Sequence, residues 1–516
     1  MRDVFGKVWL VGGGPGDPGL ITARAREVLG AADVVLYDSL VAPELLELCP
    51  RAELRSVGKR FGSESTPQAE IRDALLEHAR KGRRVVRLKG GDPTLFGRAC
   101  EEVSALAGAG IPFEIVPGVP SPLAAAAYAG IPLTHLELSS SLAIVTGKER
   151  SGTEWSSERI RKLGSAVDTV CILMGTHRLE EIAAALVEGG RAPGTPAAIV
   201  EWATTPRQRV VVAPLHELPA RARAAGIGSP AVVFVGEVVG LRERHRWFDS
   251  RPLFGRRVLV PRPEHQAAET ARAVRARGAA PVVFPVIELH DPPDPGPFRE
   301  AMAALDRYAW VLFTSANGVD RSFAELDRLG RDARAFGRAR IGAIGPRTAA
   351  ALTARGLRAD VVADEFVGEG LARSLLAADA AGPVLLPRAR VAREALPDTL
   401  RGAGLQVDVV AAYETRPLGA ERAAALAELL AGGRVDTCLF TSTSTVTATM
   451  DALGDRALGL LHPLQIACIG PVTERAAAER GLRVDVTARS YTAEGLLDAL
   501  EERTRADAAA RPAPPA

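Results

Sequence analysis

The sequence has little of several residue types on which common classes of protein depend. Its five cysteines, Cys49, Cys100, Cys171, Cys438 and Cys468, are scattered and form no C-x-x-C pair, which argues against a zinc or iron–sulfur site. Buried, reduced thiols in a cytoplasm are the better interpretation. The net charge is only +2 and no basic run is interleaved with aromatic residues, so no nucleic-acid partner is expected.

Long apolar runs are also missing. No stretch reaches the roughly 18 uncharged apolar residues of a membrane helix, and the N-terminus lacks the apolar core of a signal peptide. At 516 residues, with 47% hydrophobic and 24% charged residues, the chain has the composition of a globular protein of three or four domains. We therefore expect a cytoplasmic protein without a metal, a nucleic-acid partner or a membrane partner.

The first 245 residues alternate between helix-like and strand-like segments. Helices are predicted at Thr22–Gly30, Gln68–Lys81, Ala99–Ala109 and Leu179–Glu188, and strands at Val34–Tyr37, Ile144–Thr146, Val170–Leu173 and Ala231–Val235. This alternation predicts an α/β fold with parallel sheets covered by helices. A charged stretch at 241–246 is followed by Arg251-Pro252-Leu253, and we place the main domain boundary there.

Two glycine-rich loops each follow a strand-like apolar run. They are Gly12–Gly19, after Val8–Val11, and Gly90–Pro93, after Val85–Leu88. Glycine lets a backbone approach a ligand closely, and loops at the carboxyl ends of parallel strands usually bind ligands. We expect one small molecule to be contacted from two sides. A dinucleotide is disfavoured, because Asp17 occupies the third glycine position of the fingerprint and a proline within the first loop removes an N–H donor.

The second half of the chain repeats itself. Four blocks recur at offsets of 125 to 127 residues, namely Val258–Arg262 with Val384–Arg388, Phe313–Val319 with Phe440–Val446, Ile344–Thr348 with Ile469–Thr473, and Gly356–Val361 with Gly481–Val486. Such a repeat predicts two similar α/β lobes that face each other across a cleft.

Six motifs in the first half occur in the order seen in tetrapyrrole methylases. They are Val11–Pro18, Tyr37–Val41, Val57–Arg60, Arg87–Pro93, Val116–Gly118 and Gly130–His135. Residues 5–248 most closely resemble uroporphyrinogen-III C-methyltransferase. The resemblance implies subdomains at about 1–117 and 118–245, S-adenosylmethionine as methyl donor, and two methyl transfers to uroporphyrinogen III that give precorrin-2. It also implies a homodimer formed through this half.

The resemblance assigns roles to residues that match the motifs. The cofactor would be bound by Pro15, Gly90, Gly91, Asp92, Leu95, Pro120, Ser121, Met174 and Ala203. Asp38 would accept a proton and Lys59 would donate one; from spacing alone they are a strand-end aspartate and a surface lysine. The substrate carries eight carboxylates, so Arg60, Arg87 and Lys89 are candidates to bind it, with a solvated charged face as the alternative.

Three positions depart from the pattern of these methylases. Ser39 and Leu136 stand where many relatives have arginine, and Pro120 replaces a usual threonine or serine. The first two changes predict weaker carboxylate binding, and the third predicts an altered cofactor contact.

The duplicated half resembles uroporphyrinogen-III synthase over residues 253–505. The matching motifs are Val260–Pro263, Phe313–Gly318, Gly345-Pro346, Leu386–Arg388, Tyr413–Thr415, Thr441–Val446, Gly470–Thr473 and Tyr491–Leu496. The resemblance implies cyclisation of hydroxymethylbilane to uroporphyrinogen III with inversion of ring D, without a cofactor. One lobe would comprise about 253–288 with 417–505, and the other 289–416.

Candidate substrate-binding residues in this half sit at strand ends and helix starts. They are Ser315, Asn317, Thr441, Ser442 and Thr492, together with Arg262 and Arg388 at equivalent repeat positions. Hydroxyl and N–H groups at helix starts bind carboxylates, and helix capping is a compatible alternative. Surface ion pairing is the alternative for the two arginines. Tyr413 matches a cleft tyrosine of the family and would contact the departing hydroxyl; hinge packing is the alternative.

We therefore expect a bifunctional tetrapyrrole enzyme. A two-subdomain methylase fold at 1–248 would be followed by a linker at 249–254, a bilobed, internally duplicated synthase fold at 255–505 and a disordered tail at 506–516. Two other interpretations stay open. The methylase could act on a later corrin intermediate, or the synthase-like half could be a tetrapyrrole-binding or scaffolding module.

Overall fold

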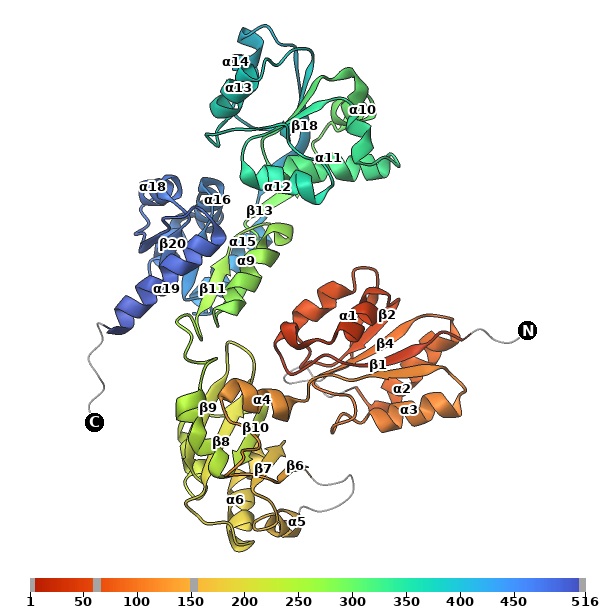
Figure 1. Ribbon diagram of the computed structural model, residues 1–516, viewed down its shortest axis with the longest axis vertical. Helices are drawn as coiled ribbons and strands as arrows, with labels where there is room; N and C mark the ends of the chain where they lie inside the picture. The colour runs from red at the N-terminus through yellow and green to blue at the C-terminus, as the bar shows by residue number, and fades with distance from the viewer. Residues whose placement is uncertain (1–4, 59–65, 149–155, 510–516) are drawn as a thin grey trace. The chain divides into compact units, whose positions relative to one another are not determined.

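The computed structural model describes residues 5–58, 66–148 and 156–509 (Figure 1). The chain divides into two compact units. The first comprises Met1–Arg257 with Arg272–Pro281 and Glu501–Ala516, and the second comprises Val258–Ala271 with Val282–Leu500. Within the described ranges, no helix combines the length and the apolar character needed to cross a membrane.

The N-terminal sheet of the first unit is parallel throughout, with strand order β3-β2-β4-β1-β5. Its strands are β1 (Val8–Gly12), β2 (Val34–Tyr37), β3 (Glu53–Ser56), β4 (Val85–Lys89) and β5 (Phe113–Val116), and its helices are α1 (Ala23–Gly30), α2 (Gln68–Arg80) and α3 (Ala99–Gly108). Because strand side chains alternate, Val34, Leu36 and Val85 pack with α2 and α3, while Val35, Val86 and Leu88 pack with α1. Both faces of the sheet are therefore buried.

The second sheet of this unit is mixed, with order β6-β7-β10-β8-β9. Its strands are β6 (Leu142–Thr146), β7 (Thr169–Leu173), β8 (Pro196–Glu201), β9 (Arg209–Pro214) and β10 (Ala231–Val235), and its helices are α4 (Ser121–Ala129), α5 (Glu158–Lys162), α6 (Leu179–Glu188), α7 (Leu218–Ala224) and α8 (Arg242–His245). The prediction of an entirely parallel sheet was wrong here, because β10 is antiparallel to both β7 and β8, and β8 is antiparallel to β9. The short connection between β8 and β9 has no room for the crossover that a parallel pair needs.

The predicted elements of this half are confirmed to within two residues at their ends. Residues 249–254, predicted as a linker, instead pack into the unit: Leu253 is fully buried and the Phe254 ring contacts Phe248. Aromatic and apolar contacts therefore hold the segment in place, although the charged residues around it in the sequence suggest an exposed linker.

The duplicated half forms two sheets with related strand orders, β12-β11-β19-β20-β21 and β13-β18-β17-β14-β15-β16. The first contains β11 (Arg257–Val260), β12 (Ala280–Val283), β19 (Thr437–Phe440), β20 (Gln465–Cys468) and β21 (Val486–Thr487), with helices α9 (Glu264–Ala276), α15 (Ala420–Ala431), α16 (Thr443–Leu453), α17 (Ala457–Leu461), α18 (Pro471–Glu479) and α19 (Ala493–Ala509). The second contains β13 (Ile287–His290), β14 (Trp310–Phe313), β15 (Arg340–Ala343), β16 (Val361–Val362), β17 (Val384–Ala389) and β18 (Val407–Pro417), with helices α10 (Gly296–Ala303), α11 (Ala316–Arg328), α12 (Pro346–Ala354), α13 (Gly368–Ala377) and α14 (Ala395–Gly402).

The repeated sequence blocks occupy equivalent places in these two sheets. The run β11-β19-β20-β21 in one sheet corresponds to β17-β14-β15-β16 in the other, strand for strand. The repeat found in the sequence therefore marks a structural duplication, as predicted.

The start of the predicted disordered tail was placed too early, because α19 continues to Ala509. Ion pairs between Arg503 and Asp507 and between Arg505 and Glu501 join residues one helical turn apart at this end. Residues 510–516 lie outside the described part of the chain.

Candidate active sites

The two glycine loops of the first unit contact each other directly. Gly14 and Gly91 exchange two backbone hydrogen bonds, of 3.2 and 2.7 Å, and the Gly13 amide donates to the Lys89 carbonyl at 2.7 Å. Two further glycines complete the group: a Cβ on Gly12 would lie 2.5 Å from the Gly118 nitrogen, and a Cβ on Gly118 would lie 2.3 Å from the Gly91 oxygen. Only glycine permits this approach, so the carboxyl ends of β1, β4 and β5 form one continuous backbone surface.

The Asp92 carboxylate connects the loops after β4 and β5 by hydrogen bonds. One carboxylate oxygen accepts hydrogen bonds from the Thr94 amide and hydroxyl and from the Leu95 amide at 3.3 Å, and the other accepts from the Gly118 amide at 3.0 Å. Burial would raise the pKa of the Asp92 carboxyl, but these donors outweigh burial and lower that pKa below its ordinary value. A cofactor hydroxyl or ammonium would therefore meet an ionised carboxylate that already orders two loops.

The loop that carries Pro15 also meets the end of β8. A Cβ on Gly16 would lie 2.8 Å from a Thr205 methyl carbon, and the Asp17 amide donates to the Thr204 hydroxyl at 3.0 Å. The Tyr128 hydroxyl of α4 donates to the Asp17 carboxylate at 2.7 Å. Loops from the two sheets of this unit therefore contact one another.

The remaining predicted cofactor residues occupy strand ends or a helix start around these loops. Gly90 follows β4, Leu95 bonds to Asp92, Pro120 and Ser121 begin α4, Met174 follows β7, and Ala203 follows β8. Since β7 and β8 are both antiparallel to β10, Met174 and Ala203 lie at the same edge of their sheet.

Backbone strain is concentrated in these loops. Six non-glycine residues of the described chain have a positive φ, and five of them are Phe96, Arg98, Met174, Trp202 and Thr204. Such conformations are costly and persist where the surroundings enforce them, most often at functional sites.

A buried charged cluster lies beside these loops. Asp38 continues the row of Val34 and Leu36, and Arg87 and Lys89 continue the row of Val85, so the alternation of β2 and β4 directs all three charged side chains to the face covered by α2 and α3. The Arg87 guanidinium forms an ion pair with Asp38.

Arg87 and Lys89 are not surface cations. They are 2% and 4% exposed, and both form ion pairs with the fully buried carboxylate of Glu102 on α3. Sequence reasoning missed Glu102, although Ala99, Glu102 and Leu106 together form the buried stripe of that helix.

Two further predicted residues, Lys59 and Arg60, lie outside the described residues. The preceding Gly58 packs against the chain beside Asp38, where a Cβ would lie 2.1 Å from the Ser39 nitrogen. Of the departures from the methylase pattern, Leu136 is 99% exposed.

In the duplicated half, the structure brings together two predicted residues from different elements. The Tyr413 hydroxyl of β18 lies 3.0 Å from the Ser315 hydroxyl, and Tyr413 is 6% exposed. Ser315 also caps α11 by accepting from the Gly318 amide at 3.1 Å, and Asn317 lies in the first turn of the same helix.

The other lobe repeats the capping arrangement. Ser442 accepts from the Thr445 amide at 3.3 Å at the start of α16, and its hydroxyl lies 2.9 Å from that of Ser444. Thr441 immediately precedes this cap, and Thr492 accepts from the Gly495 amide at 3.0 Å near the start of α19. Helix capping is thus confirmed for Ser315 and Ser442, and it is compatible with carboxylate binding.

The two repeat-related arginines are both buried. Arg388 forms an ion pair with Glu394 and donates to the Arg393 carbonyl at 2.7 Å, while its Nε is buried without a hydrogen-bond partner. Burial, assisted by the charge of Arg347, lowers the pKa of the Arg262 guanidinium to about 10. Both guanidinium groups are therefore buried, and Arg388 forms the ion pair that the sequence left open, with a carboxylate that is 56% exposed.

Each lobe also places an exposed aromatic ring over a glycine. A Cβ on Gly345 would lie 3.1 Å from the Phe366 ring, and a Cβ on Gly470 would lie 2.9 Å from the Tyr491 ring. The two rings are 62% and 64% exposed. They follow β16 and β21 at the carboxyl edges of the parallel strands, in a chain with only 5% aromatic residues.

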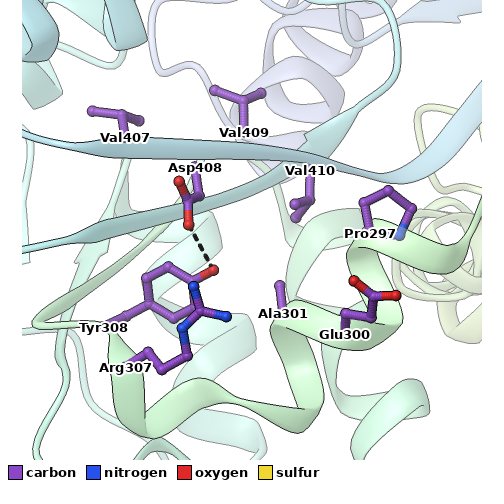
Figure 2. Close-up of a pocket in the computed structure, with 9 residues that line it drawn as sticks. All are labelled: Pro297, Glu300, Ala301, Arg307, Tyr308, Val407, Asp408, Val409 and Val410. Carbon is purple, nitrogen blue, oxygen red and sulfur yellow. Dashed lines mark hydrogen bonds between the residues drawn. The ribbon is translucent and has the colours of Figure 1, made fainter.

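A separate pocket of about 360 Å³ lies between α10 and the beginning of β18, and Figure 2 shows the residues that line it. The Tyr308 hydroxyl donates to Asp408 there at 2.9 Å, and burial together with this carboxylate raises the pKa of Tyr308 to about 12. None of the predicted site residues lines this pocket.

The family comparisons match the first half of the chain to one family and the duplicated half to another. Residues 7–219 match the model of Tetrapyrrole (Corrin/Porphyrin) Methylases, and residues 268–498 match that of Uroporphyrinogen-III synthase HemD. A porphyrin biosynthesis protein HemD of Ruminiclostridium josui is 38% identical over 501 residues, which are 96% of this chain and 98% of that protein. The chain belongs to this family of porphyrin biosynthesis proteins. It comprises a tetrapyrrole methylase followed by a uroporphyrinogen-III synthase.

Other relatives match the methylase alone. A siroheme synthase of Chromobacterium violaceum is 50% identical over 250 residues, which are 48% of this chain and 52% of that protein. This chain therefore spans about half the length of that relative. A solved structure of uroporphyrin-III C-methyltransferase from Thermus thermophilus, complexed with S-adenyl homocysteine, is 44% identical with a TM-score of 0.40, and the match covers 46% of this chain and 100% of that chain.

The glycine contacts of the methylase predict a large effect of a single methyl group. Gly12→Ala places its Cβ against the backbone of Gly118, so we expect a loss of stability of about 1–3 kcal/mol, measured as a lower denaturation midpoint. Gly108→Ala is the control, because a Cβ there has no neighbour within 4 Å. Equal midpoints for the two variants would contradict the packing described above.

Proposed function

We propose that this chain catalyses two consecutive reactions. The synthase would cyclise hydroxymethylbilane to uroporphyrinogen III with inversion of ring D, and the methylase would transfer two methyl groups from S-adenosylmethionine to that product, giving precorrin-2. The observation that carries the proposal is that one chain matches both families. In each half, most of the candidate site residues that the structure describes follow strands or begin helices.

The methylase loops fit S-adenosylmethionine. Gly90 and Gly118 are partly exposed and have no side chain to cover their peptide groups, and Asp92 offers an ionised carboxylate to a hydroxyl or ammonium group. The donor supplies an electrophilic methyl group. Because an electron-rich pyrrole carbon attacks it, the protein's task is alignment of the two partners and removal of a proton. Asp38, which is half-buried and paired with Arg87, is the residue proposed for the second task.

In the synthase, the proposed role of the protein is to fold a linear substrate. The capped helix starts at Ser315 and Ser442 present N–H and hydroxyl donors to acidic side chains of the substrate, and the buried cations Arg262 and Arg388 add positive charge. Tyr413 would donate a hydrogen bond to the departing hydroxyl. No step requires a cofactor.

The whole chain, incubated with hydroxymethylbilane, tests both reactions. We expect uroporphyrinogen III without S-adenosylmethionine and a doubly methylated product with it, followed by absorbance and mass. Formation of the type I isomer alone, which arises by spontaneous closure, would favour the interpretation that the synthase-like half only binds tetrapyrroles. Methylation of a later corrin intermediate, but not of uroporphyrinogen III, would favour the other alternative.

The Tyr413 hydroxyl gives a sharper prediction for the synthase. Tyr413→Phe removes the contact with Ser315 and the proposed donor, so we expect kcat to fall by about 10²-fold, within the usual range for a positioned proton donor. Tyr308→Phe is the matched control, since it removes a buried hydroxyl of the same lobe that bonds to Asp408. If both variants keep the parent's kcat, Tyr413 has no part in the reaction.

The paired rings of Phe366 and Tyr491 are proposed to pack against pyrrole rings of the substrate. We expect Phe366→Ala and Tyr491→Ala each to raise KM several-fold, because stacking of one ring contributes about 1 kcal/mol, and the double variant to raise it further. The denaturation midpoint should not change, since both rings are mostly exposed. Leu376→Ala, which truncates an exposed apolar side chain on α13, is the control.

A homodimer formed through the methylase also stays a proposal. Light scattering of the purified chain measures its mass in solution.

A further inference from the structure

Glu102 makes more contacts with charged groups than its packing on α3 requires. Its carboxylate is fully buried and accepts four hydrogen bonds: from Gln68 Nε2 at 3.0 Å, from Arg87 Nε at 3.2 Å, and from Lys89 Nζ at 3.0 Å to each oxygen. Its donors come from α2 and β4, so three elements meet at one anion.

Such a cluster is costly to bury. Burial and the neighbouring charge of Arg87 lower the pKa of Lys89, in spite of its contact with Glu102. Well-packed apolar residues at such positions are often as stabilising as buried ions. Val85, in the same row of β4, shows that this face accepts an apolar side chain. Stability alone therefore does not account for charged residues at positions 87, 89 and 102.

Arg87 connects this cluster to the proposed reaction site, because it contacts both Glu102 and Asp38. Its Nε bonds to Glu102, its Nη1 donates to the Leu88 carbonyl at 3.1 Å, and its Nη2 bonds to the Asp38 carboxylate. A planar guanidinium held at all three nitrogens has a single orientation. The side chain of Asp38 is 32% exposed, whereas that of Arg87 is 3% exposed, so only Asp38 of this pair is open to a ligand.

We propose that Glu102, together with Lys89, is a positioning residue of the methylase, which fixes Arg87 so that Arg87 holds Asp38 in the orientation that accepts the proton lost from the methylated tetrapyrrole. The proposal rests on the proposed function, and it replaces the expectation that Arg87 and Lys89 bind substrate carboxylates. The two cations balance the carboxylates of Glu102 and Asp38, so Lys89 supplies the charge that lets Glu102 engage Arg87 without leaving a net buried anion.

The test is a set of variants in the full chain, assayed for methyl transfer to uroporphyrinogen III. We expect Glu102→Gln and Arg87→Lys each to lower kcat by about 10²-fold, since a small misplacement of a reacting group has an effect of that size. The dissociation constant of S-adenosylmethionine, measured by calorimetry, should change less than about twofold, because neither residue belongs to the glycine loops. A loss of donor binding equal to the loss of kcat would overturn the proposal.

A double-mutant cycle separates positioning from a structural role. If Glu102 acts only through Asp38, then Glu102→Gln has no further effect on kcat in an Asp38→Asn background. Additive losses would overturn the proposal. Where Glu102→Gln fails to fold, the charge-balanced pair Glu102→Gln with Lys89→Met and the single variant Arg87→Lys decide the question by the same cycle.

Glu114→Gln is the matched control. Glu114 lies on β5 of the same sheet and also accepts from several donors, Lys7, Trp9 and Arg24, but it has no contact with Asp38. Its kcat should equal that of the parent. If Asp38→Asn keeps full activity, the proposed proton acceptor itself is wrong. If Asp38→Asn is slow while Arg87→Lys and the Glu102 variants match the parent, only the positioning proposal fails.

Discussion

The methylase depends on three backbone segments approaching more closely than side chains allow. Gly12, Gly91 and Gly118 lie at or just beyond the ends of three neighbouring strands, and a Cβ on Gly12 or on Gly118 would clash with the backbone of the other two segments. The hydrogen bonds between Gly14 and Gly91 and those to Asp92 are possible only at this separation. The contact between these three segments is thereby made mostly by peptide groups, whose positions are fixed by the sheet and not by rotamers.

The synthase solves a similar problem by different means. Its two sheets repeat one strand order, and each places a serine cap and an aromatic ring over glycine at the carboxyl edge. Duplication thereby provides two matched sets of hydrogen-bond donors and exposed apolar rings. Among the described side chains, the asymmetry lies in Tyr413, which contacts the serine cap of one lobe and has no counterpart at the serine of the other.

Much of this architecture could be predicted from the sequence, because it depends on local patterns. Helix α6 and strands β2 and β10 have the predicted bounds, and the glycine motifs and the repeat identified the sheet edges at which the candidate residues lie. What the sequence did not reveal depends on contacts across the chain. The direction of β10 follows from its partners, and the pairing of Arg87 with Glu102 joins a strand to a helix that follows it. In the sequence, Phe366 and Tyr491 resemble ordinary loop residues, because their packing over Gly345 and Gly470 is visible only in the structure.

The hydrogen bonds around Ser315 connect Tyr413 to the start of α11. The Gly318 amide can only donate, so it occupies one lone pair of the Ser315 oxygen and leaves the hydroxyl proton and the second lone pair for the contact with Tyr413. When Ser315 donates to Tyr413, the phenol proton points away from the serine, and each bond in the row strengthens the next. In that arrangement, the partial positive charge at the start of α11 is extended through the Ser315 side chain to the Tyr413 oxygen on β18.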